Sequence, residues 1–354
     1  MKSLYKTNNN VRRGFTRNLD ERIEYFNEGK LYTTEVKLTS NCSLQCKYCY
    51  AESTPACTQS LPTEKIEELI NDCAETGIKQ MNWGGGEPLE RKNWHELMRY
   101  TNEKGLENLL MTNGCLLHQM ETAEKVANLV DMVFVHIDTL NLGIWKQLHG
   151  TNQELHQKQI DGIINLLDSG FPCEDVAISM TLTKQIFENE DYKKTLDWAY
   201  DELGVAAILF PYRNFGFAGQ TMDFNPTFEQ MAEAYKYRNG KDGIHSGPGF
   251  GTKFYCGTKC YVQAGGELMG CSMVYPTYVG NINKIRFKDL YLRNKDVLTY
   301  NKLHNPRNIK GHCSKCEHNT FCWGCRAASE LIAGGFQKSD PICWVKKEND
   351  FDGF

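Results

Sequence analysis

Hydrophobic runs alternate with amphipathic segments between about residues 32 and 213. This alternation is typical of parallel strands joined by crossover helices. The strands are predicted at residues 33–39, 79–83, 107–111, 131–137, 176–182 and 206–212. Six strand–helix units of this kind predict an α/β fold, a partial (β/α)6 barrel.

One crossover helix is clearly marked between the first two strands. Thr63 can cap its N-terminus, apolar side chains follow at helical spacing, and Gly77 ends it. The apolar positions are Ile66, Leu69, Ile70, Cys73 and Ala74. A later helix is predicted near residues 226–238.

The chain is expected to divide after that later helix. Residues 239–251 contain five glycines and a proline, a composition that favours a flexible connector. The alternative is a lid over an active site, because long loops often carry function. The predicted parts are an N-terminal segment (1–31), the barrel (32–238), a glycine-rich linker (239–253) and a small cysteine-rich C-terminal domain (254–354).

Polar or glycine-rich groups follow five of the predicted strands. In parallel α/β folds, ligands gather beyond the carboxyl ends of the strands, so one rim should collect these groups. They are a cysteine loop after the first strand, residues 84–88 after the second, 112–114 after the third, 136–138 at the end of the fourth and 211–213 at the end of the sixth.

Composition and charge narrow the function classes. The 354 residues include 40 basic and 44 acidic side chains, for a net charge of -4, and no basic block indicates nucleic acid. No long apolar run indicates a membrane segment or secretion signal, so a cytoplasmic protein is expected. Because the cytosol keeps thiols reduced, the 15 cysteines favour metal ligation over disulfides.

The most informative motif is a triad formed by Cys42, Cys46 and Cys49. Three thiolates on one loop can hold three corners of a 4Fe-4S cube, whose fourth iron then stays open to a small molecule. A zinc site is the alternative, and it would need a fourth ligand. The intervening residues offer none nearby: Asn41, Ser43, Gln45 and Lys47. An iron–sulfur cluster is therefore favoured.

A second motif, Gly84-Gly85-Gly86-Glu87-Pro88, follows the second strand. Glycine lets the backbone approach a ligand closely, and the Glu87 carboxylate can accept hydrogen bonds from an ammonium group. The loop therefore suits a cofactor that carries an amino acid.

The cysteine triad with Tyr48 inside it, together with the Gly-Gly-Glu-Pro run at 85–88, resembles the radical S-adenosylmethionine (radical SAM) enzymes. The resemblance implies that the methionyl amino and carboxylate groups chelate the open iron and that the glycine run contacts the amino group. It also implies that one electron from the reduced cluster cleaves the sulfonium, giving methionine and a 5′-deoxyadenosyl radical that removes a substrate hydrogen atom. The expected cofactor contacts are Tyr48, Gly85, Gly86, Glu87, Asn113 and Asp138.

The roles of three rim residues each have two interpretations. Asn113 and Asp138 are candidates for polar contacts to the adenosine, and a capping or turn role is the alternative for each. His136 occupies a position at which many members of the family have serine. It either faces the core or contacts the ligand.

A second cysteine group occupies the C-terminal third. Its short paired spacings indicate metal ligation, with iron–sulfur favoured over zinc. The group resembles the SPASM extension of some radical SAM enzymes, which implies two auxiliary 4Fe-4S clusters and three clusters in all. The implied ligands are Cys256, Cys260, Cys271 and Cys325 for the first auxiliary cluster, and Cys313, Cys316, Cys322 and Cys343 for the second.

Cys260 lies unusually close to Cys256 in sequence, so its role has alternatives. It is a ligand, or it is free and leaves an open iron for substrate, or it returns a hydrogen atom to a substrate radical. The scattered cysteines lack paired spacing and are expected to be inert or buried thiols. These are Cys57, Cys73, Cys115 and Cys173. Trp83 and Phe210 are expected to pack in the barrel.

Enzymes that resemble this two-part layout mostly modify peptides, so peptide crosslinking, oxidation or epimerisation is the favoured activity. The alternatives are a dehydrogenase or epimerase of a sugar, aminoglycoside or other small molecule, and a non-catalytic electron carrier. Ser272 argues against the sulfatase-maturing branch, in which an aspartate holds this position. The expected partners are a one-electron donor such as flavodoxin or ferredoxin and, because only about thirty residues precede the first strand, a separate leader-peptide-binding protein.

Overall fold

The structure is a computed structural model that describes residues 15–150, 152–220, 224–242 and 252–345. Its nine-stranded sheet has the order β6-β5-β4-β3-β2-β1-β7-β8-β9. The six barrel strands are parallel neighbours. They are β1 (Thr33–Thr39), β2 (Gln80–Gly85), β3 (Glu107–Thr112), β4 (Met132–His136), β5 (Val176–Leu182) and β6 (Ala206–Pro211). The predicted α/β fold with six parallel strands is confirmed.

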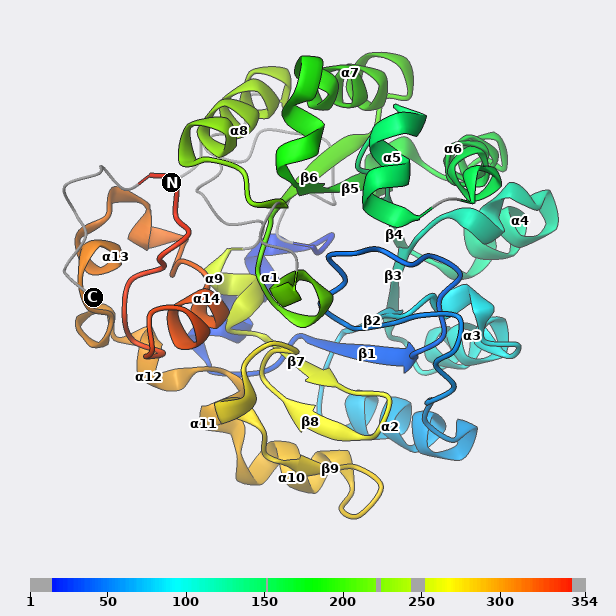
Figure 1. Cartoon of the computed structure of the whole chain (residues 1–354). Helices are drawn as coiled ribbons and strands as arrows, with labels where there is room; N and C mark the ends of the chain where they lie inside the picture. The colour runs from blue at the N-terminus through cyan, green and yellow to red at the C-terminus, as the bar shows by residue number, and fades with distance from the viewer. Residues whose placement is uncertain (1–14, 151, 221–223, 243–251, 346–354) are drawn as a thin grey trace.

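Helices surround the outside of the curved sheet (Figure 1). They are α2 (Thr63–Glu75), α3 (Trp94–Glu103), α4 (Met120–Leu129), α5 (Leu142–His149), α6 (Gln153–Asp168), α7 (Asp191–Asp197) and α8 (Phe228–Asp242). The capping prediction for Thr63 is wrong, because Pro62 holds the cap position and Thr63 is already helical. The Thr63 hydroxyl instead accepts hydrogen bonds from Arg91 and Asn93, at 3.0 and 3.1 Å.

The last barrel helix is longer than predicted. Helix α8 continues to Asp242, so residues 239–242 of the predicted linker are helical. Lys241 explains part of this extension, because its ammonium group pairs with Asp197 at 2.7 Å and Asp201 at 2.5 Å on the neighbouring segment. Residues 243–251 of the predicted linker or lid lie outside the described residues.

The C-terminal region continues the barrel sheet. β7 (Lys259–Val262) pairs in parallel with β1, and β8 (Glu267–Met269) and β9 (Gly280–Asn281) follow antiparallel. In Figure 1 the chain after β9, orange to red, passes below the sheet and fills the side between α8 and β7. Short helices dominate this part: α9 (Lys253–Cys256), α10 (Phe287–Arg293), α11 (Lys295–Leu298), α12 (Asn301–His304), α13 (His312–Lys315) and α14 (Arg326–Leu331).

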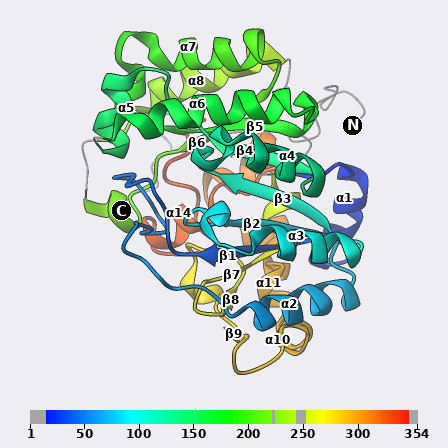
Figure 2. The same cartoon turned by 90° about the vertical axis from the view of Figure 1, so that its right-hand side faces the viewer.

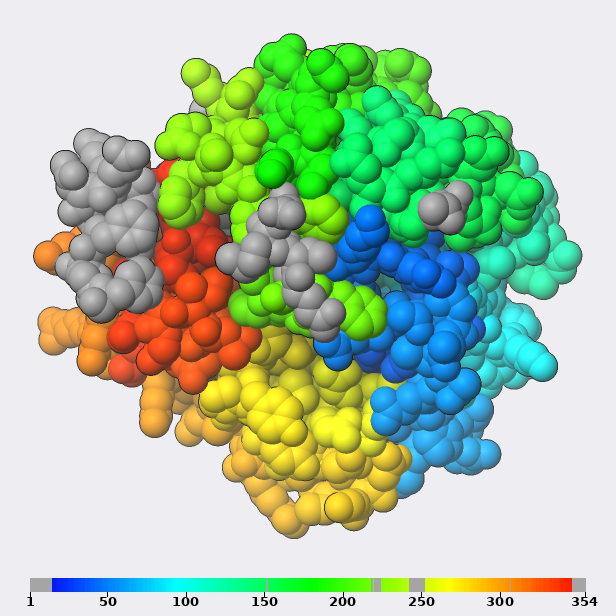
Figure 3. Space-filling model, viewed as in Figure 1, coloured from blue at the N-terminus to red at the C-terminus, as the bar shows by residue number. Residues whose placement is uncertain are grey.

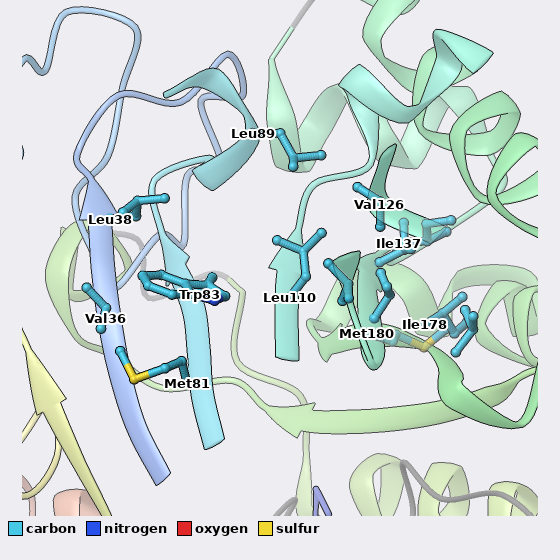
Figure 4. Packing of buried hydrophobic residues seen from close by; sticks show 14 of the residues in the cluster. Val36, Leu38, Met81, Trp83, Leu89, Leu110, Val126, Ile137, Ile178 and Met180 are labelled. Carbon is cyan, nitrogen blue, oxygen red and sulfur yellow. The ribbon is translucent and has the colours of Figure 1, made fainter. Parts of the chain in front are cut away.

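The main apolar core lies between the sheet and the helices. Side chains alternate along a strand, so Val36 and Leu38 of β1 pack outward with Met81 and Trp83 of β2 (Figure 4). All four side chains are at most 1% exposed. Trp83 therefore packs in the core, as predicted.

The inside of the barrel is filled at one end. Phe15 packs there against Phe134 and Tyr255, with ring centroids 5.1 and 4.3 Å apart. Figure 2 shows α1 (Leu19–Asn27) and the blue loop after β1 at opposite ends of the strands. The carboxyl ends of the strands therefore remain available for a site. Among the described residues, none of the helices is sufficiently long and apolar to cross a membrane.

Candidate active site

A cavity of about 290 Å³ opens at the carboxyl ends of the strands. Side chains or backbone from β1 to β7 line it, together with the cysteine loop and residues 271–273. The segment after β6 packs on the cysteine loop, where Phe217 N–H donates to the Cys49 carbonyl at 3.1 Å. Figure 3 shows the blue, green and yellow segments meeting on this face. The structure therefore brings the predicted rim together.

Cys42, Cys46 and Cys49 all line this cavity. Burial raises the pKa of the Cys42 thiol to about 12. Burial, and then Cys49 and Cys42, raise the pKa of Cys46 well above its ordinary value. Three neighbouring thiols suit a bound cation, because metal ions stabilise thiolates. This donor set fits the predicted cluster.

The glycine loop lies directly against the cysteine loop. Gly86 N–H donates to the Thr39 carbonyl and Glu87 N–H to the Asn41 carbonyl, both at 2.7 Å. A Cβ atom on Gly86 would lie 2.1 Å from the Asn41 oxygen, and Gly85 has a φ of +122°. Glycine is therefore required here for close backbone packing, and both glycines line the cavity.

The structure does not place Glu87, a predicted cofactor contact, on the cavity. Its side chain is completely buried and does not line the cavity. The carboxylate accepts hydrogen bonds from Thr112 Oγ1 at 2.7 Å, Asn113 N–H at 2.6 Å and Leu89 N–H at 3.1 Å. Glu87 thus holds the glycine loop to the end of β3, because three internal donors occupy its oxygens.

Asn113 makes a turn contact and also lines the cavity. Its Oδ1 accepts the Cys115 N–H at 2.8 Å, which is a turn contact. Its Nδ2 lies 3.3 Å from Ser43 Oγ and 3.6 Å from Cys42 Sγ, and the residue lines the cavity. Asn113 therefore connects the third strand to the cysteine loop.

Asp138, the other predicted adenosine contact, does not line the cavity, because its carboxylate is buried behind other side chains. It contacts the Tyr48 hydroxyl, His149 Nε2 at 3.1 Å and Thr181 N–H at 2.6 Å. Burial alone would raise the pKa of Asp138, but His136 and His149 hold it below its ordinary value. Tyr48 and His136 line the cavity in its place, so His136 faces the ligand side.

His149, which the sequence analysis did not single out, joins this group. Its Nδ1 lies 3.1 Å from Cys46 Sγ, and ligand atoms of Cys46, His136 and His149 lie within 4.8 Å of one another. His136 and His149 therefore supply two imidazole groups of the kind that the zinc alternative requires, although both are distant from Cys46 in the sequence. No local motif marks His149, because helix α5 delivers it to the cysteine loop through tertiary packing.

Several C-terminal cysteines lie close enough to influence one another's pKa. Burial raises the pKa of Cys256 to about 12, and Cys271 and Cys325 contribute to the rise. Burial likewise raises the pKa of Cys343 to about 12, and Cys313 and Cys316 contribute. Burial also raises the pKa of Cys322, and Cys343 and Cys313 contribute.

The structure does not place Cys260 on the cavity. Its Sγ lies 3.5 Å from Thr34 Oγ1, which also accepts from the Cys73 thiol at 3.3 Å. Cys260 is fully buried in the outer core, whereas its neighbours Lys259 and Tyr261 line the cavity. Alternation along β7 places Cys260 on the opposite face from the cavity. This position on the outer face does not support the predicted roles of Cys260 as a cluster ligand or as a hydrogen donor in the cavity.

The scattered cysteines occupy different environments. Cys73 and Cys115 are buried, Cys57 is half-buried and Cys173 is exposed. None of these four lines the cavity. The prediction of a core thiol is confirmed for Cys73. Phe210, predicted to pack in the barrel, also lines the cavity.

A buried ion pair that the sequence analysis missed lies on the cavity wall. Lys259 Nζ is 2.5 Å from Glu35 Oε2, and the Tyr255 hydroxyl also donates to Glu35. Burial alone would favour the neutral amine, but Glu35 raises the pKa of Lys259 well above its ordinary value. The alternation in Lys-Cys-Tyr-Val at 259–262 is the sequence signal for this wall, because in a strand it places Lys259 and Tyr261 on the same face.

Comparisons with known proteins bear on this site. Residues 36–199 match the model of the Radical SAM superfamily. The AdoMet-dependent heme synthase of Methanosarcina barkeri is 26% identical over 346 residues, covering 87% of this chain and 94% of that protein. The mycofactocin maturase MftC of Mycolicibacterium smegmatis is 24% identical over 329 residues, covering 87% of this chain and 81% of that protein.

A solved structure has the same fold. Streptococcus suis SuiB bound to its precursor peptide SuiA matches with a TM-score of 0.67 at 16% identity, covering 92% of this chain and 80% of that chain. At this identity the likeness concerns the fold alone.

Proposed function

Because residues 36–199 form a radical SAM domain, we propose that the protein cleaves S-adenosylmethionine reductively and abstracts a hydrogen atom from a substrate in the cavity. The observation that carries this proposal is the position of Cys42, Cys46 and Cys49 on one cavity beside Gly85 and Gly86. A 4Fe-4S cluster, when bound, supplies the electron that breaks the sulfonium and yields the 5′-deoxyadenosyl radical.

The residues of the chain prepare that chemistry. Backbone packing between Gly86 and Asn41 fixes the glycine loop beside the three thiols. Tyr48, His136 and Asn113 supply polar groups on the cavity wall that suit a nucleoside. Apolar side chains, among them Phe134 and Phe210, limit water around a reactive intermediate.

We extend the proposal to the cysteine-rich C-terminal region, as a SPASM-type domain with two auxiliary clusters. The first would be held by Cys256, Cys271 and Cys325, and the second by Cys313, Cys316, Cys322 and Cys343. With the first triad this gives three 4Fe-4S clusters. Such clusters can carry an electron away from a substrate radical, which suits a net oxidation. They also suit a reducing compartment such as the cytoplasm.

The favoured substrate class is a peptide. One relative supports it by name, since MftC is a maturase. SuiB, with which this chain shares the fold, was solved with a bound precursor peptide. The reaction would be a crosslink, an oxidation or an epimerisation. Its electron would come from a one-electron donor such as flavodoxin or ferredoxin, and a separate protein would present the leader peptide.

A small molecule is the second candidate. The heme synthase of M. barkeri matches across 94% of its length, which favours a tetrapyrrole over the sugar or aminoglycoside suggested by the sequence.

The direct test is 5′-deoxyadenosine production by anaerobically reconstituted protein with dithionite and S-adenosylmethionine. Cys46→Ala should reduce the product to the level without enzyme, because a two-cysteine site cannot hold the cluster in this form. Cys173→Ala is the matched control, since its thiol is exposed and remote from the cavity, and it should retain full activity. Product formation by Cys46→Ala, or none by wild type, would contradict the proposal.

Substrate class is tested by deuterium transfer. Deuterated candidate peptides and a deuterated tetrapyrrole are incubated separately with the enzyme. Label in 5′-deoxyadenosine from the peptide alone supports the first candidate, and label from the tetrapyrrole alone supports the second.

A further inference from the structure

A polar cluster of four side chains lies at the inner end of the cavity wall. Glu35 of β1, Asn82 of β2 and Lys259 of β7 line the cavity, and Glu35 lies opposite Asn82 in the register of the two strands. The fourth member, Tyr255, packs against Phe15 inside the barrel. Asn82 is 1% exposed and Lys259 is 7% exposed. A polar group that reaches this cluster is therefore shielded from water.

Glu35 holds the other three members of the polar cluster in place. Its Oε2 accepts from Lys259 Nζ at 2.5 Å, and its Oε1 accepts from Asn82 Nδ2 at 3.1 Å and from the Tyr255 hydroxyl. Because a carboxylate can only accept hydrogen bonds, it fixes the amide of Asn82 with the NH₂ group toward Glu35. Three donors occupy the oxygens of Glu35, so this residue positions its neighbours and leaves ligand contacts to them.

The orientation of Asn82 leaves its carbonyl oxygen without a partner. Its Nδ2 lies 3.1 Å from Glu35 and 3.2 Å from the Tyr255 hydroxyl, whereas Oδ1 is buried and accepts no hydrogen bond from the described residues. Buried polar atoms are almost always satisfied in folded proteins. An unsatisfied acceptor on a cavity wall therefore indicates a donor that a bound molecule supplies, in place of any water that occupies the free cavity.

Lys259 offers the complementary kind of group beside Asn82. An ammonium has three N–H donors, of which Glu35 takes one, and the Tyr255 ring centroid lies 5.3 Å from Nζ. The cluster thus offers a ligand one acceptor and one donor, and its single ion pair is already neutral. A carboxylate on the ligand would place a second acceptor against Asn82 Oδ1, and an ammonium or guanidinium would be repelled by Lys259. A neutral ligand group that both donates and accepts fits best.

We propose that Asn82 and Lys259 bind a primary carboxamide of the substrate, the side chain of an asparagine or glutamine in a peptide. The N–H of this amide donates to Asn82 Oδ1, and its carbonyl oxygen accepts from Lys259 Nζ. A backbone amide fits less well, because a trans peptide bond points its N–H and its carbonyl in opposite directions. This inference rests on the peptide substrate proposed above, and it gives the cavity a residue-specific recognition site.

The head group is tested by binding to the full-length protein, reconstituted without oxygen and saturated with S-adenosylmethionine. Saturation-transfer NMR titrations compare butyramide, butyrate, butylamine and 1-butanol. Butyramide should bind at least about tenfold more tightly than the other three, because each of them leaves a buried group of the cluster unsatisfied or shares one oxygen between two partners. Equal or tighter binding of butyrate, butylamine or 1-butanol would overturn the carboxamide assignment. The measurement includes no cleavage step, so failure of the proposed radical chemistry would not affect it.

The peptide source of the carboxamide is tested with the N-acetyl methylamides of glutamine, asparagine and glutamate. The glutamine or the asparagine derivative should bind at least about tenfold more tightly than both butyramide and the glutamate derivative, because the neutral amide satisfies the cluster and the peptide groups add contacts. Affinity no better than that of butyramide would assign the cluster to a small amide instead of a peptide. No binding of either amide derivative would overturn the proposal.

The role of Asn82 is tested by Asn82→Leu, which removes the acceptor and nearly preserves the size of the side chain. Affinity for the blocked amide should fall at least about fivefold, and affinity for S-adenosylmethionine should stay unchanged. Thr34→Val is the matched control, because Thr34 is buried next to Glu35 on the outer face of β1, beside Cys260. It should retain both affinities.

Unchanged amide binding in Asn82→Leu would overturn the proposal. Loss of S-adenosylmethionine binding in Asn82→Leu, but not in Thr34→Val, would assign Asn82 to the cofactor and overturn it as well. If thermal denaturation shows that Asn82→Leu does not fold, Asn82→Ser replaces it, because the shorter side chain also withdraws the acceptor. The same loss of amide affinity is then expected.

Discussion

At the residue scale, close packing explains why glycine is required in the loop after β2. Gly86→Ala would place a Cβ atom 2.1 Å from the backbone oxygen of Asn41. The two loops must separate, which should lower the free energy of unfolding by roughly 1–3 kcal/mol and weaken S-adenosylmethionine binding. Calorimetry and equilibrium dialysis measure the two effects.

Gly240→Ala is the matched control for that substitution, because open space surrounds Gly240 on helix α8. It should leave nucleotide binding unchanged and slightly raise stability. Equal behaviour of the two variants would show that the loop contact is unimportant.

Glu87 should give the protein a distinct pH dependence. Burial raises its pKa from 4.5 to about 7 despite hydrogen bonds from Asn113, Thr112 and Leu89. The folded state therefore binds this proton more tightly than the unfolded state. Its contribution to the free energy of unfolding is complete below the unfolded pKa and is lost as pH rises through about 7, by up to about 3 kcal/mol.

Glu87→Gln removes this titration, so urea unfolding at about pH 5.5 and about pH 8 should give more similar free energies than in wild type. Glu121→Gln is the control, because Glu121 is exposed on helix α4 and should leave the wild-type difference intact. A pH dependence that persists in Glu87→Gln would assign it to another group.

At the element scale, strand β7 determines which C-terminal side chains reach the cavity. It pairs with β1 over Thr33 to Val36, so alternation turns Lys259 and Tyr261 inward and Cys260 outward. The cysteine spacing alone could not show this, because a spacing carries no information on the strand that contains it. The alternating pattern at 259–262 predicts which side chains point inward and which point outward, but only once the segment is known to be a strand.

The buried ion pair between Glu35 of β1 and Lys259 of β7 should contribute to stability as a coupled pair. Lys259→Met leaves Glu35 charged and unpaired in the wall, so we expect a loss of roughly 3–5 kcal/mol in the free energy of unfolding. The double variant Glu35→Gln, Lys259→Met should recover most of that loss. Urea unfolding of the two single variants and the double variant gives the coupling energy, and additive losses would show that the pair is not coupled.

At the scale of the whole molecule, the two halves have different sources of stability. β1 to β6 are covered on their outer face by helices and rest on a large apolar core. The region of α12, α13 and α14 has helices of four to six residues, too short to be stable alone. Cysteine–metal bonds would provide the missing cross-links.

Removal of metal with an iron chelator should therefore act locally. Amide hydrogen exchange at 301–343 should increase by at least about tenfold, whereas β1 to β5 should keep their protection. Restoring iron and sulfide without oxygen should reverse the change. An equal increase in exchange throughout the chain would indicate that the protein unfolds as one cooperative unit. No increase at 301–343 would show that metal does not stabilise these residues.

The sequence by itself determined the strand positions, the six parallel units, the cysteine triad and the glycine loop, because periodicity and short motifs are local properties of the chain. Tertiary structure alone decided which side chains share the cavity. It turned Glu87, Asp138 and Cys260 away from the cavity, placed Lys259 on its wall and brought His149 behind that wall to Cys46 and Asp138. The physical reason is that the orientation of a polar side chain depends on partners that distant segments supply, and their positions are fixed only when the sheet and helices pack.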